Sequence, residues 1–211
     1  TDRCIEYDIK TVDKWLLHLK NYTKGNFSIS GKNVLELGPG SDLGVGVYLI
    51  SKGCSRYNAF DVNNLMENVP NVFYDKLINK LRSINPKIDN NYLKQQIDAI
   101  ELGDSSKLNY VVQKEFDFIP LFGESKIDII FSQAAFEHFD DMEIAVSEIS
   151  KVCKPKAKLI IEIDLQTHSR WIRDKDPNNI YRFSKNLYNV FWFSGIPNRL
   201  RPFQYKKLFE K

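Results

Sequence analysis

Five short apolar runs along the chain have the length and composition of buried β-strands. They cover residues 32–37, 56–60, 110–112 (with residue 108 as an alternative start), 127–132 and 158–163. Between them, apolar residues recur every three or four positions, as in helices that pack on a sheet. The helical segments cover residues 11–22, 43–52, 72–81, 92–100 and 140–153. Strands that alternate with helices favour a parallel sheet. We therefore predict an α/β fold of the Rossmann-like, doubly wound kind, with a mostly parallel sheet and helices on both faces.

Two segments are longer than the connections of such a fold require. Residues 62–107 separate the second and third strands and contain two of the helical patterns, so we expect a helical insertion there. Residues 166–211 follow the fifth strand and are rich in basic and aromatic residues. We expect residues 1–211 to form a single domain, because 211 residues suit one α/β core better than two.

The strongest local signal is the turn after the first strand, Glu36-Leu37-Gly38-Pro39-Gly40, with Ser41 or Asp42 as the expected helix cap. The spacing of its glycines is one residue wider than the G-x-G-x-x-G of dinucleotide sites. The Glu36 carboxylate would repel a pyrophosphate but attract an ammonium group, and Pro39 lacks an N–H for a phosphate. The turn favours a cationic nucleoside ligand over NAD, and a purely structural turn is the alternative.

A second acidic residue follows the second strand. Asp61 lies about twenty residues after the glycine turn, where an acid can accept hydrogen bonds from both ribose hydroxyls. An aspartate that only caps a turn or helix is the alternative reading.

Three ordered blocks resemble class I S-adenosylmethionine (SAM) dependent methyltransferases, of the methyltransferase type 11-like kind. Residues 34–40 resemble motif I, residues 127–139 resemble the fourth-strand block with its Glu-His pair, and residues 148–157 resemble the block that precedes the fifth strand. The last block has Lys151 for the usual Arg and a Lys-Ala pair for the usual Gly-Gly. The sixth and seventh strands of the family have no visible counterpart, so we expect the C-terminal strands to be truncated.

The resemblance implies roles for individual positions. Glu36, Gly38, Pro39 and Gly40 would hold the methionine end of SAM, Asp61 its ribose, and Phe116 with Asp117 its adenine, while Gln133 would lie beside the transferred methyl. Glu115 and Asp104 compete with Asp117 for the adenine position.

Methyl transfer from a sulfonium is an in-line displacement that the protein promotes mainly by alignment. A hydroxyl acceptor also needs a base. His138 is the first candidate, with a structural histidine as the alternative, and His168 is the second catalytic candidate.

The segment after the fifth strand, which we call the tail, limits the chemical class of the methyl acceptor. Residues 164–168 (Asp-Leu-Gln-Thr-His) and 198–201 (Asn-Arg-Leu-Arg) resemble a bacterial methyltransferase subgroup tied to glycan or polysaccharide synthesis. His168 and the arginines 170, 173, 199 and 201 would clamp a phosphate or carboxylate. The aromatic residues 171, 181, 188 and 191–193 would bind a sugar or, in the reading we favour for most of them, pack as a small second core.

Composition limits the other classes of function. The net charge is only +3, although residues 166–211 carry ten Lys/Arg against three Asp/Glu, so nucleic acid is not the expected partner. Three scattered cysteines indicate neither a disulfide framework nor a zinc site, and we predict no metal. With no membrane span and no signal peptide visible, we expect a cytoplasmic protein.

The sequence thus predicts a SAM-dependent O-methyltransferase that acts on a small or glycan-linked, acidic acceptor. A non-catalytic SAM-binding module and an NAD(P)-dependent oxidoreductase are the alternatives, and an RNA or protein methyltransferase is a weaker one. The oligomeric state stays open.

Overall fold

A computed structural model describes residues 1–66 and 69–210 of the chain. Its centre is a five-stranded sheet in the order β3-β2-β1-β4-β5, and every pair of neighbouring strands is parallel. The strands are β1 (Asn33–Leu37), β2 (Arg56–Asp61), β3 (Leu108–Val112), β4 (Ile127–Gln133) and β5 (Cys153–Glu162). The predicted parallel α/β fold is therefore confirmed.

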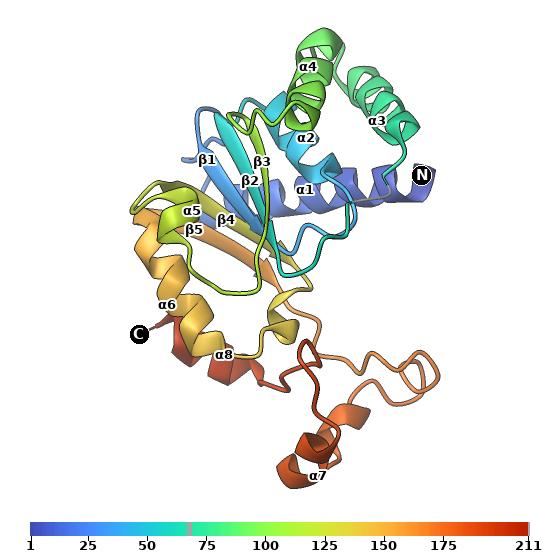
Figure 1. Cartoon of the computed structure of the whole chain (residues 1–211), viewed down its shortest axis with the longest axis vertical. Helices are drawn as coiled ribbons and strands as arrows, with labels where there is room; N and C mark the ends of the chain where they lie inside the picture. The colour runs from blue at the N-terminus through green and yellow to red at the C-terminus, as the bar shows by residue number, and fades with distance from the viewer. Residues whose placement is uncertain (67–68, 211) are drawn as a thin grey trace.

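Helices cover both faces of the sheet (Figure 1). One face carries α1 (Asp2–Tyr22), α2 (Gly44–Ser51), α3 (Asn71–Ile84) and α4 (Asn90–Glu101). The other face carries α5 (Ile119–Phe122), α6 (Met142–Val152) and α8 (Pro202–Phe209). The single turn η1 (Phe136–His138) follows β4 and buries Phe136 in the core of this second face, whereas η2 (Asn179–Tyr181) and the short α7 (Lys185–Val190) follow β5.

The alternation of side chains along the strands creates two separate cores. In β1, Val34 packs with α1 and α2, whereas Leu35 and Leu37 pack with α5 and α6. Glu36 alternates with Leu35 and so points to the same face as Val34, toward α1. The only charged residue of the central strand thus lies beneath the N-terminal helix.

Helix α1 begins nine residues before the predicted segment and lies across the sheet. Trp15 anchors it, because its indole stacks on the Phe131 ring of β4 with centroids 4.6 Å apart and planes 4° from parallel. Seven residues of α1 are buried, and one of them, Asp8, is an acid. Periodicity alone did not show the first turns, because this polar stretch of the helix has few apolar residues.

Local details differ from the sequence predictions at two places. The N-cap of α2 is Leu43, not Ser41 or Asp42, and Asp42 instead accepts a hydrogen bond from the Gly44 amide at 2.8 Å. Strand β5 begins at Cys153, with a register shift opposite Ile127 and Ile129. Lys156 takes a φ of +68° there, the conformation that the family's glycine favours.

The predicted insertion between β2 and β3 forms α3 and α4, which pack against each other and against α1 and α2. The tail leaves β5, projects away from the sheet through α7 and returns to pack α8 on α6 (Figure 1). Of the helices in the described part of the chain, none combines the length and the apolarity needed to cross a membrane.

Candidate functional site

The predicted cofactor residues gather at the carboxyl ends of β1, β2 and β4, where parallel sheets bind ligands. The chain turns sharply after β1, because Gly38 and Gly40 both have positive φ angles, +76° and +79°. The Gly38 amide donates to the Phe60 carbonyl at 2.9 Å, which ties the turn to β2. This turn holds backbone N–H groups close to the carboxyl edge of the sheet.

Gly38 is required for packing as well as for its φ angle. A Cβ at residue 38 would lie 2.4 Å from the Cβ of Ala135, in the loop after β4. At Gly40, by contrast, a Cβ would meet nothing within 4 Å. The loops that follow β1 and β4 therefore touch at Gly38 and leave Gly40 open.

We predict that Gly38→Ala lowers the free energy of unfolding by about 1–3 kcal/mol more than Gly40→Ala. Both variants bear the cost of a positive φ, about 1–2 kcal/mol, but only Gly38→Ala overpacks the loop contact. Urea unfolding of the two variants measures the difference, and equal losses would contradict the packing role of Gly38.

Glu36 is buried, with 2% of its surface exposed. The Tyr57 hydroxyl donates a hydrogen bond to it and lies 2.5 Å from Oε2. Burial, with a smaller contribution from nearby Asp42, raises the pKa of Glu36 to about 8, although the Tyr57 hydrogen bond opposes the rise. A carboxyl group is thus held in the interior beside a neutral partner.

Two further acids lie beside Glu36. Asp8 of α1 is 5% exposed, and its Oδ2 atom has no hydrogen-bond partner among the described residues. Burial, together with the nearby carboxyl groups of Asp42 and Glu36, raises the pKa of Asp8 to about 9. Burial also raises the pKa of Asp42. We call Asp8, Glu36 and Asp42 the acidic cluster.

No cation of the described residues 1–66 and 69–210 forms an ion pair with the acidic cluster. Burying like charges without a counterion is costly, so such groups either hold protons or await a cationic ligand. The pattern of residues along the chain points to Glu36 but not to Asp8. A charged residue among the buried positions of α1 was the available signal, but the start of that helix was not recognised.

Asp61 ends β2 at the same edge of the sheet and is partly buried, which raises its pKa. Its Oδ1 accepts from the Asn63 amide at 2.9 Å. Tyr110 of β3 braces the loop that follows, since its hydroxyl donates to the Asn63 carbonyl and accepts from the Leu65 amide. The carboxylate of Asp61 is therefore held in place and keeps accepting capacity.

The candidates for the adenine position fall into different surroundings. The Phe116 ring lies 5.4 Å from the Phe60 ring and 4.9 Å from the Phe139 ring, measured between centroids. Asp117 is exposed, as is Glu115. Asp104 precedes β3 and so lies at the opposite end of the sheet, which is why it is excluded as a rival.

Gln133 ends β4 and links it to the neighbouring strand. Its amide Nε2 donates to Glu162 Oε1 at 2.8 Å, and Glu162 also forms an ion pair with Lys14 of α1. The Gln133 Oε1 atom is buried and has no hydrogen-bond partner within the part of the chain that the structure describes. One polar atom at the carboxyl end of β4 is therefore available to a ligand.

The two histidine candidates come together although thirty residues separate them. The rings of His138, in η1, and His168, in the tail, have centroids 4.8 Å apart. His138 Nδ1 is 2.6 Å from the Gly195 carbonyl, and His168 Nε2 is 3.7 Å from Asp164 Oδ2. Burial lowers the pKa of His168, and the neighbouring His138 lowers it further.

Glu137 lies beside the two histidines. In the sequence it stands out only as the Glu of the Glu-His pair in residues 127–139. It is 2% exposed, and neither carboxylate oxygen forms a well-directed hydrogen bond with a described residue. Burial raises its pKa, although the amides of Glu137 and Asp164 and the ring of His138 lie close enough to lower it partly.

The tail is held against η1 by Asn198. Its amide donates to the carbonyls of Phe136 and Phe139, its backbone amide donates to the Glu137 carbonyl, and its Oδ1 accepts from Tyr205. Through this contact the tail lies beside η1, with Gly195 next to His138 and Asp164 next to His168.

The expectation that the tail aromatics form a small second core is wrong for four of them. Trp171, Phe191, Trp192 and Phe193 are exposed, Trp171 at 91%. The segment around α7 projects from the sheet (Figure 1), and the exposed fractions of these four side chains show that no apolar layer of the described chain covers them.

The predicted arginine clamp is not assembled in this structure, because tail residues already engage the guanidinium groups. Arg201 lies 3.4 Å above the Tyr181 ring centroid and Arg199 4.5 Å above that of Tyr188. Arg173 donates to Asp164 at 2.6 Å.

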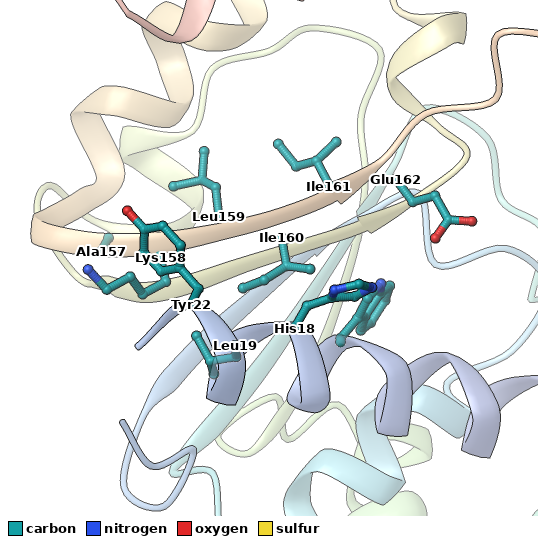
Figure 2. Close-up of a pocket in the computed structure, with 10 residues that line it drawn as sticks. His18, Leu19, Tyr22, Ala157, Lys158, Leu159, Ile160, Ile161 and Glu162 are labelled. Carbon is teal, nitrogen blue, oxygen red and sulfur yellow. The ribbon is translucent and has the colours of Figure 1, made fainter. Parts of the chain in front are cut away.

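A hollow opens between α1 and β5 (Figure 2). Leu19 and His18 of α1 face Ile160 and Glu162 of β5 across it. None of the residues predicted to bind the cofactor lines this hollow, so we assign it no part in cofactor binding.

Comparison with known proteins supports the methyltransferase fold. A family model described as a methyltransferase domain matches residues 82–161, which run from the end of α3 to β5. No curated protein matches the sequence significantly.

Solved structures share the fold at low identity. A protein of Galdieria sulphuraria, described as a sarcosine dimethylglycine methyltransferase, has a TM-score of 0.54 at 17% identity over 96% of this chain and 60% of its own. Phosphoethanolamine N-methyltransferase 2 of Haemonchus contortus, solved with SAM, has a TM-score of 0.54 at 15% identity over 94% of this chain and 36% of its own. A Haloferax volcanii methyltransferase, solved with its activator Trm112, has a TM-score of 0.50 at 17% identity over 97% and 71%.

The chain spans 60% and 36% of the length of the first two of these structures, and at such identities the likeness concerns the fold alone. The sheet order adds to it, because strands β1 to β5 have the arrangement 3-2-1-4-5 expected of that fold. The chain therefore has the fold of SAM-dependent methyltransferases, and its residues 82–161 match the model of a methyltransferase domain.

Proposed function

We propose that this chain binds SAM at the carboxyl ends of β1 and β2 and transfers its methyl group to a small acceptor. The observation that carries the proposal is the acidic cluster, in which Asp8 and Glu36 are buried, Asp42 is half-buried, and none has an ion-pair partner among the described residues. An α-ammonium group beside it would supply the missing positive charge. A dinucleotide pyrophosphate would instead be repelled.

The remaining groups fit the other parts of the cofactor. The Gly40 amide and the Glu36 carboxylate would hold the methionine end, with Gly38 and Pro39 shaping the turn. Asp61 would accept hydrogen bonds from the ribose. Phe116 would offer a ring to the adenine, and Asp117, exposed nearby, a carboxylate.

When bound, SAM supplies an electrophilic methyl group on a sulfonium. The protein's own task is then to align the acceptor and exclude water. Gln133 lies at the end of β4 with its buried Oε1 free of described partners, and would orient the acceptor. His138 and His168 lie on the loops beyond β4 and β5, where they would hold the acceptor or take its proton.

The acceptor that we propose is a hydroxyl on a small or glycan-linked, acidic molecule. Three features support this choice: the histidine pair, the tail segments 164–168 and 198–201, and the exposed tryptophan and phenylalanine rings around α7. Such rings suit the apolar faces of sugars. The proposal treats residues 1–211 as one catalytic domain, with residues 62–107 and 166–211 as its acceptor-side additions.

Calorimetric titration tests the cofactor directly. The purified chain is titrated with SAM, with S-adenosylhomocysteine and with NAD+. We expect heat of binding for the first two and none for NAD+. Binding of NAD+ alone would overturn the proposal and favour an oxidoreductase. Incubation with radiolabelled SAM and candidate sugar acids then separates an enzyme from a binding module.

Asp61→Asn is predicted to weaken SAM binding about 10- to 100-fold, because a hydrogen bond to a charged group contributes about 1.5–3 kcal/mol. The asparagine side chain can still accept from the amide of residue 63, so the turn should persist. Asp104→Asn is the matched control, since Asp104 accepts from the Ser106 amide in the same way at the other end of the sheet. Equal affinities of the two variants would remove Asp61 from the site.

A further inference from the structure

We infer that Glu137, His138 and His168 form a binding site for one divalent transition-metal ion. The sequence offered no metal signature, because the ligands come from two loops whose contact depends on the fold. One ring nitrogen of each histidine and one carboxylate oxygen of Glu137 lie within 4.8 Å of one another. A modest inward shift of these side chains would bring all three atoms to the metal–ligand distances of about 2.0–2.2 Å.

The state of Glu137 is the second observation that points to a ligand. Its side chain is 2% exposed, yet neither carboxylate oxygen has a well-directed hydrogen bond from any described residue. A buried carboxylate without partners costs several kcal/mol unless a cation neutralises it. The two histidines are the groups placed to share such a cation with it.

The surroundings of the histidines match those of metal-ligating imidazoles. His138 Nδ1 lies 2.6 Å from the Gly195 carbonyl, so this nitrogen donates its proton and the Nε2 lone pair is left for a ligand. His168 has Asp164 beside it at 3.7 Å. Arg173 neutralises Asp164 through a 2.6 Å hydrogen bond, which leaves one net negative ligand, Glu137, in the site.

A site of two imidazoles and one carboxylate favours Zn2+, Co2+ or Fe2+. Mg2+ and Ca2+ prefer sites made of oxygen ligands alone. Three protein ligands leave at least one position for another oxygen. If the chain has the proposed function, the acceptor hydroxyl would bind the ion at this open position. The ion would then lower the pKa of that hydroxyl. In the metal-bound protein the histidines would act as ligands rather than as bases, and the proton of the more acidic acceptor hydroxyl would pass to water.

Titration with Zn2+ alone tests the site. The full chain is treated with chelator, desalted and titrated with Zn2+ in competition with a chromophoric chelator. We expect one tight equivalent in the wild type, weakened at least about 100-fold in His168→Ala and in Glu137→Gln, because each removes one of three ligands. His18→Ala is the matched control, since His18 is the third histidine, lies exposed on α1 and is not one of the three clustered ligands. It should bind Zn2+ as the wild type does.

Titration with Co2+ gives a readout of the ligand set itself. The wild type should show the visible absorption of a low-symmetry Co2+ site, and His168→Ala should lose it. Circular dichroism and thermal melting establish that each variant is folded, and His168→Ala, which alters a half-buried loop residue, serves if Glu137→Gln unfolds. Zn2+ affinity that is unchanged in His168→Ala, or equally reduced in His18→Ala, would overturn the metal site.

SAM titration of the same samples separates this inference from the proposed function. Zn2+ binding that requires His168, without any SAM binding, would support the metal site and reject the methyltransferase proposal. SAM binding without a tight equivalent of Zn2+ would reject the metal site and leave the methyltransferase proposal standing.

Discussion

Glu36→Gln is expected to weaken SAM binding by about 30- to 1000-fold. Removing the charge from one member of a buried charged contact costs about 2–4 kcal/mol, and every 1.4 kcal/mol corresponds to a factor of ten. Glutamine keeps the volume of the side chain and can still accept from the Tyr57 hydroxyl, so the change concerns charge more than packing. Calorimetry with SAM and with S-adenosylhomocysteine measures the loss at neutral pH.

Tyr57→Phe is the matched control for this loss. It removes the hydrogen bond of 2.5 Å to Glu36 and leaves the carboxyl group in place. We expect it to reduce affinity less than Glu36→Gln does. If Glu36→Gln bound SAM as tightly as the wild type while remaining folded, the ammonium group would not lie at the acidic cluster.

Without cofactor, the protein is expected to lose stability as the pH rises from about 5 to 9. Burial raises the pKa of Glu36 from 4.5 to about 8 and that of Asp8 from 3.8 to about 9. The folded protein therefore keeps protons that the unfolded chain releases, and the stabilisation present below the unfolded pKa values disappears as the pH passes the folded ones. Each retained proton accounts for up to about 1.4 kcal/mol per pH unit within this window.

Urea unfolding across this pH range at constant ionic strength measures the slope. The double variant Asp8→Asn/Glu36→Gln should be less dependent on pH and more stable than the wild type at the alkaline end, because it buries no carboxyl groups at these positions. Titrating groups outside the acidic cluster, including His168, contribute equally to both proteins and cancel in the difference. A wild-type slope no steeper than that of the double variant would show that the acidic cluster holds no protons.

Both predictions depend on the same pair of elements. Glu36 comes from the central strand and Asp8 from the helix that precedes it in the chain. Asp8→Asn alone should weaken SAM binding less than Glu36→Gln, since Asp8 Oδ2 lies over Gly44 at the start of α2 rather than at the end of β1. A smaller loss in Asp8→Asn than in Glu36→Gln would indicate that Glu36 lies nearer than Asp8 to the positive charge of bound SAM.

The pattern of apolar residues was sufficient to predict a sheet and the parallel orientation of its strands. Continuous apolar runs such as residues 127–132 can be satisfied only by burial on both faces, and helical spacing between them leaves a parallel arrangement as the simple solution. The position of Glu36 in such a run was also readable, because a charged residue in a central strand is expensive unless it meets a ligand.

Only the tertiary structure could show the groups that meet across the chain. Asp8 reaches Glu36 because Trp15 fixes α1 on Phe131, and His168 reaches His138 and Glu137 because Asn198 ties the tail to η1. Spacing along a sequence specifies local periodicity and the direction of each side chain within its own element. It carries no information on which distant loops pack together, since that depends on the summed free energy of many non-local contacts. For this reason the strands and the glycine turn followed from the amino-acid order, whereas the acidic cluster and the Glu137–His138–His168 site were decided by the folded packing.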